Sequence, residues 1–155
     1  MLEYDFEQSL GYWLTMTTQA YHRAFSNEIA PYGITYRQSQ VLSWLVLEKE
    51  MSQSQLAVKM MIEPPSLVGI LDRMERCGWI SRRSCEIDRR RKWIRVAPAA
   101  EPVWEKIVAC AKQIRARATD GLTVRQQATL KNLLRRVQQN VSTQAPLPAT
   151  RLQGR

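Results

Sequence analysis

The chain has little of what metal sites and catalytic centres require. It has one histidine and only three cysteines among 155 residues. Cys77, Cys85 and Cys110 are irregularly spaced and form no C-x-x-C pair, which excludes the common zinc frameworks. His22 has no neighbouring serine, aspartate or cysteine constellation, and no glycine-rich phosphate loop is present. We therefore expect neither an enzyme nor a bound cofactor.

Long apolar runs are also missing. None approaches the roughly 18–20 residues of a membrane span. The first residues, MLEYDFEQSLGYW, are acidic before they are apolar, which is unlike a secretory signal. Hydrophobic residues nevertheless make up 45% of the chain, enough for a folded core. We expect a cytoplasmic protein with no membrane partner.

Positive charge dominates and is concentrated in two blocks. The net charge is +9. Residues 64–95 hold nine Lys/Arg against four Asp/Glu, a net +5, and residues 112–155 hold nine against one, a net +8. Residues 1–31 hold one against four, a net −3. Such basic blocks are typical of proteins that bind a polyanion, most often nucleic acid, although a solvated surface can have the same composition.

Apolar spacing predicts long helices at both ends of the chain. Steps of three and four residues separate the apolar side chains over 5–30. The same spacing returns over about 98–119 and, after a break, over about 123–141. The tail, 142–155, is rich in proline, alanine and polar residues, and we expect it to be loose.

The middle of the chain predicts three further helices and a hairpin. Capping-box patterns over residues 35–38 and 52–55 open the first two helices. The third begins at Pro64-Pro65 and ends near Gly78, a residue that favours the positive φ of a helix C-cap. Strand-like residues after Gly78 flank a basic tip. The expected fold is therefore mainly α with a small β-hairpin (α+β), a helix-turn-helix with a hairpin wing.

Four segments of this region carry a family resemblance. They are ITYRQSQVL, SQSQLAVKM, PPSLVGILDRMERCGWISRR and DRRRKWIRV. In these segments the chain resembles the MarR family of bacterial regulators, and within it the SlyA branch. The resemblance implies a homodimer in which residues 1–141 of each copy form a single MarR-type unit. The winged helix-turn-helix lobe would then occupy about 35–97, and the dimerisation helices about 5–30 and 99–141.

A fold of this kind predicts two surfaces for double-stranded DNA. The second helix of a helix-turn-helix fits the major groove, and a wing reaches the minor groove. The outward residues of the proline-led helix are expected to contact a pseudo-palindromic operator: Pro65, Ser66, Val68, Gly69, Arg73 and Arg76. By resemblance, Arg90 enters the minor groove and Asp88 holds it. The expected wing set is Asp88, Arg89, Arg90, Arg91 and Lys92.

Two features of the proline-led helix depart from a simple DNA-reading surface. SlyA-like proteins usually carry an arginine where this chain has Gly69, so their sequence preference does not transfer. The arginines Arg73 and Arg76 have an alternative role as surface ion pairs with Asp72 or Glu75.

Many MarR relatives bind small aromatic acids between the dimer helices and the winged-helix lobe. Six residues of this chain are expected to line that site: Trp13, Met16, Tyr36, Ser39, Ser43 and Trp44. None is basic, whereas SlyA-like proteins supply arginines there. The aromatic and polarisable side chains favour a neutral aromatic or hydrophobic ligand, although they equally suit an ordinary core.

The expected function is therefore a homodimeric, sequence-specific DNA-binding transcription regulator, cytoplasmic and nucleoid-associated. We expect a repressor that a small hydrophobic or aromatic effector releases from DNA. A SlyA-like activator or anti-silencer is an alternative. Two others are a redox sensor that uses Cys77 or Cys85, and a winged-helix protein-interaction module, which the intact basic wing disfavours.

Overall fold

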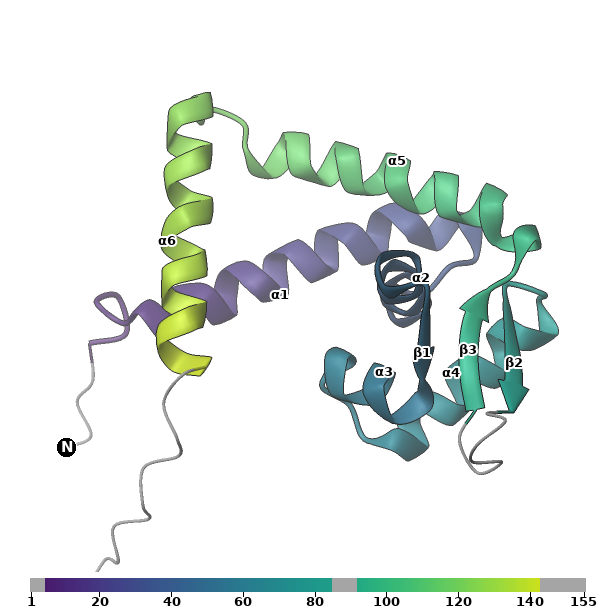
Figure 1. Cartoon of the computed structure of the whole chain (residues 1–155). Coiled ribbons are helices and arrows are strands. Elements are labelled where there is room, and N and C mark those ends of the chain that lie inside the picture. Colours follow the sequence, from purple (N-terminus) through teal and green to yellow (C-terminus); the bar gives the residue numbers. More distant parts are fainter. Residues whose placement is uncertain (1–4, 85–91, 143–155) are drawn as a thin grey trace, which may run out of the picture. The chain divides into compact units, whose positions relative to one another are not determined.

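The structure is a computed structural model that describes residues 5–84 and 92–142. The described chain forms two compact units, one within residues 1–115 and one within residues 116–155. Helices dominate both units, and a small antiparallel sheet lies in the first (Figure 1). The predicted fold class, mainly α with a small β element, is confirmed. Of the described helices, none is long and apolar enough to cross a bilayer.

The first unit holds most of the secondary structure. Its elements are α1 (Leu10–Ile29), the 3-10 helix η1 (Ala30–Tyr32), α2 (Tyr36–Glu48), β1 (Glu50–Ser52), α3 (Gln53–Met60), α4 (Pro64–Arg76), β2 (Ile80–Ser84), β3 (Lys92–Val96), the 3-10 helix η2 (Pro98–Ala100) and α5 (Glu101–Ala118). The last turn of α5 extends into the second unit, which contains α6 (Val124–Ser142).

The first helix begins later than its apolar pattern predicts. The pattern indicates a helix from residue 5, but α1 begins at Leu10. There the Ser9 hydroxyl accepts a hydrogen bond from the Tyr12 amide at 3.3 Å and caps the helix. Upstream, the Asp5 carboxylate accepts the amides two and three residues further on and closes a separate turn. Local side-chain bonds therefore decide this boundary.

The capping boxes predicted from the sequence are present. At the start of α2, the Gln38 amide donates to the Thr35 hydroxyl at 3.2 Å, and the Thr35 amide donates to Gln38 Oε1 at 2.9 Å. The same reciprocal bonds open α3 and α6. Each box satisfies two amides that would otherwise lack a partner at a helix start.

The sheet has one strand more than predicted. The predicted hairpin strands are β2 and β3, which pair antiparallel from Ile80 opposite Val96 to Ser84 opposite Lys92. β1 follows α2 almost directly and pairs with the other edge of β3, so the strand order is β1-β3-β2. A three-residue strand between two helices has no room for a detectable alternation.

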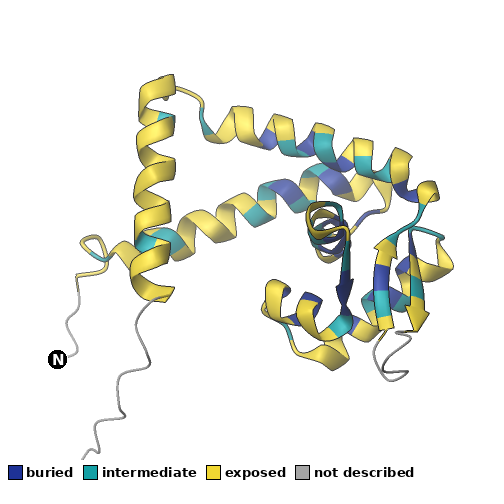
Figure 2. Cartoon of the chain, viewed as in Figure 1, coloured by how far each residue is buried: buried dark blue, intermediate teal, exposed yellow. Residues whose placement is uncertain are grey.

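The core of the first unit joins the helix-turn-helix, the sheet and the helices α1 and α5 (Figure 2). Its fully buried side chains are Ile29, Val41, Leu42, Leu45, Leu56, Leu67, Leu71, Met74, Ile94, Cys110 and Ile114. Truncating one such aliphatic side chain to alanine costs about 2–5 kcal/mol. The core thus fixes the orientation of α4 and of the sheet.

Two helical faces leave large apolar side chains outside that core. On α1, Leu10 is 56% exposed and Trp13 is 54% exposed. On α6, Leu133 is 55% exposed, and no residue of that helix is buried (Figure 2). Amphipathic helices usually cover such stripes by packing against another helix.

Candidate DNA interface

The helix α4 has one face in the core and one face in solvent. Leu67, Leu71 and Met74 are fully buried. The residues predicted to face DNA are all exposed: Pro65, Ser66, Val68, Gly69, Arg73 and Arg76. This division follows from the helical repeat, which puts residues three and four apart on one face. The core therefore holds α4 while the predicted contact set faces outward.

The start of α4 is built from proline and a tight turn. Pro64 and Pro65 occupy the first two helical positions, where a missing amide loses no hydrogen bond. The preceding helix ends at Met61 in the left-handed region, with φ of 51°. The Ser66 amide donates to the Glu63 carbonyl oxygen at 3.0 Å and closes the first turn. The leading end of α4 is thus rigid and largely apolar.

Gly69 lies on the exposed face of α4 without a packing reason. A Cβ added there would meet no heavy atom within 4 Å, apart from the helix's own backbone and its chain neighbours. Close packing of α4 against another element therefore does not require glycine at this position.

The two carboxylates of α4 pair with the wing strand β2. Arg82 Nη2 lies 2.7 Å from Asp72 Oδ1, and Arg82 Nη1 lies 3.4 Å from Glu75 Oε2. Arg76 donates instead to the backbone carbonyl oxygen of Asp72 at 3.4 Å. Within the described residues, these carboxylates thus engage Arg82 rather than Arg73 or Arg76.

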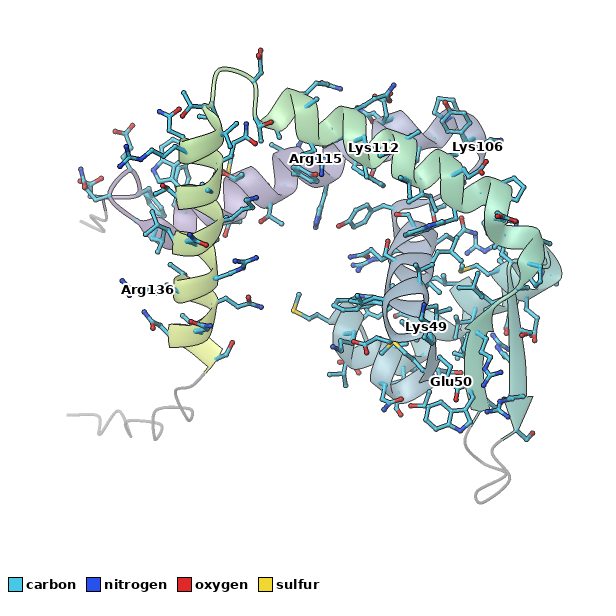
Figure 3. The ribbon with its side chains drawn as sticks, turned by 45° about the horizontal axis from the view of Figure 1, so that its top comes forward. Lys49, Glu50, Lys106, Lys112, Arg115 and Arg136 are labelled. Carbon is cyan, nitrogen blue, oxygen red and sulfur yellow. The ribbon has the colours of Figure 1, made fainter. Side chains whose placement is uncertain are left out.

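A second group of ion pairs ties the three strands together near the base of the wing. Glu50 of β1, labelled in Figure 3, pairs with Arg95 of β3 and, at 3.4 Å, with Arg83 of β2. The hydrogen bond from Arg95 is the main reason why the pKa of the Glu50 carboxyl falls below its usual value, and Arg83 adds to the effect. Glu50 of β1 therefore braces the wing by pairing with both of its strands.

One of the predicted wing residues can be placed. Lys92 is exposed at the start of β3. The others lie outside the described residues: Asp88, Arg89, Arg90 and Arg91.

The residues predicted to line an effector site lie in different settings. Trp13 and Met16 are 54% and 44% exposed on α1. Tyr36 of α2 packs its ring against His22, at 4.4 Å between centroids, and against Phe25, at 5.9 Å. Burial in this cluster raises the pKa of the Tyr36 phenol. Aromatic contact between α1 and α2 is thus part of the packing.

Three of the residues predicted for the effector site remain, and a lysine that the sequence pattern did not indicate lies beside one of them. The hydroxyls of Ser39 and Ser43 donate to carbonyl oxygens of α2 itself, at 2.7 and 2.8 Å. Trp44 is half-buried, and Lys59 Nζ lies 4.8 Å from its ring centroid. Lys59 also bonds to Glu48 at 3.2 Å. The lysine belongs to α3, so no spacing within α2 could reveal it.

A groove of about 660 Å³ lies at the end of α2, along β1, α3 and β3. Lys59 and Trp93 are among its lining residues, and none of the six residues predicted for the effector site is.

Comparison with known proteins identifies this arrangement. Residues 32–91 match the sequence model of the MarR family. A probable transcriptional regulator from Pseudomonas aeruginosa is similar with a TM-score of 0.73 at 28% identity, over 86% of this chain and 99% of that one. A cysteine-to-serine variant of E. coli MarR, complexed with operator DNA, has a TM-score of 0.73 at 24% identity, over 83% and 92%. BpsR from Bordetella bronchiseptica, whose DNA binding is regulated by 6-hydroxynicotinic acid, has a TM-score of 0.74 at 22% identity, over 83% and 98%.

The fold is accordingly that of a winged helix-turn-helix protein, with α3 and α4 as the helix pair and β2 and β3 as the wing. Over residues 32–91 this lobe is similar to the MarR family, and the chain as a whole shares the fold of E. coli MarR.

Proposed function

We propose that this chain is a homodimeric, sequence-specific DNA-binding regulator of transcription. The observation that carries the proposal is the exposed face of α4, which is held from behind by Leu67, Leu71 and Met74 and takes no part in the core. Similarity to E. coli MarR, which has been solved with operator DNA, supports the same use of this face.

Each end of α4 has its own task in this proposal. Ser66 in the first turn donates to a phosphate or a base edge, and Val68, which is 39% exposed, contacts a thymine methyl. Arg73 and Arg76 lie further along the helix and bind phosphates. Lys92 binds phosphates from the wing, and the resemblance to MarR relatives assigns Arg90 to the minor groove.

We propose that a second copy of the chain covers the exposed apolar faces of α1 and α6. Leu10, Trp13 and Leu133 are each more than half exposed, which is unusual for helices of a soluble monomer. A two-fold dimer presents two α4 helices to half-sites about one helical turn apart, which explains why a pseudo-palindromic operator is expected.

We propose further that the protein represses transcription and that a small neutral aromatic or hydrophobic compound releases it from DNA. Lys59, which lies over the Trp44 ring, is already paired with Glu48, so a carboxylate ligand would have to compete for it. Tyr36 and Trp44 supply half-buried aromatic surface. The wing and recognition-helix segments also favour a SlyA-like branch, although Gly69 sets this chain apart from it.

DNA binding is tested by fluorescence anisotropy with fragments flanking the protein's own gene, over a salt titration. Each phosphate neutralised by the protein contributes a slope of about −0.9 in log K against log salt. The double variant Arg73→Ala/Arg76→Ala should therefore make the slope shallower by about 2. Arg125→Ala on α6 is the matched control and should leave it unchanged. An unaltered slope in the double variant would refute the phosphate contacts of α4.

The effector is tested by a thermal-shift panel that compares salicylate-like acids with neutral phenols. Stabilisation by the neutral compounds, and its loss in Trp44→Ala, is expected. Stabilisation by the acids alone would contradict the proposed ligand class.

A further inference from the structure

The recognition helix α4 is electrically neutral by its own sequence. Asp72 and Glu75 balance Arg73 and Arg76. A helix that enters a DNA groove lies between two phosphate chains, where the potential is strongly negative. Two half-exposed carboxylates on such a helix oppose binding unless a positive charge compensates them.

Compensation comes from the neighbouring strand β2. The side chain of Arg82 is only 14% exposed, whereas those of Asp72 and Glu75 are 49% and 42% exposed. Arg82 thus reaches both carboxylates from the protein side, and they remain in contact with solvent. Because it is nearly buried, Arg82 is badly placed to bind DNA itself, and its charge acts through α4.

Arg82 is singled out from its neighbour by the alternation of the strand. Successive strand residues point to opposite faces of the sheet. Arg83 therefore points away from α4 and pairs with Glu50 of β1. On α4, Asp72 and Glu75 are three residues apart, a spacing that puts both on one face. Both of them, the two carboxylates of α4, pair with Arg82.

We propose that Arg82 is a positioning residue for DNA binding, which acts by neutralising the carboxylates of α4. This inference rests on the proposed DNA-binding function. With Arg82 included, α4 carries a net charge of +1, and Arg73 and Arg76 remain available to phosphates. Without Arg82, Asp72 and Glu75 face the phosphates uncompensated.

The test separates charge compensation from simple tethering. Arg82→Met keeps an apolar stem and removes the charge, and it should weaken binding to the operator fragment about tenfold or more at low salt. The triple variant Arg82→Met/Asp72→Asn/Glu75→Gln should recover affinity to within about threefold of wild type, because no carboxylate is left to repel DNA. Asp72→Asn/Glu75→Gln alone should bind at least as tightly as wild type.

Arg83→Met is the matched control, since its carboxylate partner lies on β1. Adding Asp72→Asn/Glu75→Gln to it should give no recovery beyond the effect of those two substitutions in the wild-type chain. Circular dichroism and a thermal melt of each variant establish that it is folded. If Arg82→Met does not fold, Arg82→Lys replaces it. Lysine keeps the charge and loses the fork, so this variant should retain most of the affinity.

The outcomes distinguish this inference from the proposed function. Wild-type affinity in Arg82→Met, or a triple variant as weak as folded Arg82→Met, overturns charge compensation while DNA binding stands. An Arg82→Lys variant that folds and yet loses as much affinity as is expected of Arg82→Met also overturns it. A wild-type chain that binds no DNA overturns the proposed function and this inference together.

Discussion

Replacing Gly69 with arginine places a side chain on the exposed face of α4 without disturbing its packing. The position lies inside the helix, and an added Cβ meets no heavy atom of its surroundings within 4 Å. Glycine in an exposed helix interior costs about 0.8–1 kcal/mol against alanine, and arginine is among the good helix formers. Gly69→Arg should therefore stabilise the fold by roughly 0.5–1 kcal/mol and raise Tm by about 2–4 °C.

The same substitution changes how α4 meets DNA. The new guanidinium follows Ser66 by one turn on the exposed face. A bidentate contact with guanine discriminates by about 1–3 kcal/mol against the wrong base. A phosphate contact instead makes the salt slope steeper by about 1 for every fragment alike. Anisotropy titrations over a panel of single-base operator variants tell these results apart.

Two glycine variants serve as controls. Gly69→Ala should give a similar rise in Tm with no new sequence preference. Gly78→Ala should lower Tm, because Gly78 has a φ of 72°, a left-handed conformation that side chains disfavour. A fall in Tm for both Gly69 variants would refute the reasoning and point to a packing role for this glycine.

Three further predictions concern other parts of the chain. Leu133→Glu should convert a dimer to a monomer in light scattering, because it puts a charge on the exposed apolar stripe of α6; Arg125→Glu should not, and a persisting dimer would exclude this stripe from the interface. Glu50 has a lowered pKa, so its stabilising effect is present above its unfolded pKa and is lost as the pH falls through its folded pKa. Glu50→Gln should therefore lose less stability between neutral and acid pH than wild type, and identical pH profiles of Tm would count against the brace. Iodoacetamide should modify exposed Cys77 well before Cys110, whose pKa is raised by burial and then by Glu28; equal rates in peptide mass spectra would contradict this.

Helix starts were the most predictable features of the structure, because a cap and the amides that it satisfies are close in sequence. The pairs Thr35 with Gln38 and Ser52 with Gln55 form the boxes that their spacing predicts. Ser9 was missed as a cap because the residue three positions on is tyrosine, which completes no box. The periodic apolar pattern alone then placed the start of α1 too early.

Features that join distant segments could not be predicted in the same way. β1 forms a strand only because β3, far along the chain, pairs with it. The carboxylates of α4 lie next to Arg73 and Arg76 in sequence, yet they pair with Arg82 because β2 packs beside them. Local spacing predicted which residues of α4 face outward, and tertiary packing decided which charges on that face are compensated.

The short strand β1 lies between α2 and α3 and pairs with the wing strand β3. Ser52 ends β1 opposite Trp93 of β3 and, in the same position, caps α3 by accepting the Gln55 amide at 3.2 Å. We therefore expect a rotation of α2 to be transmitted through β1 to both α3 and the wing. The winged-helix lobe should then move as a unit. In a dimer, a ligand that acts on α2 would then regulate the spacing of two such lobes along the DNA rather than the shape of either.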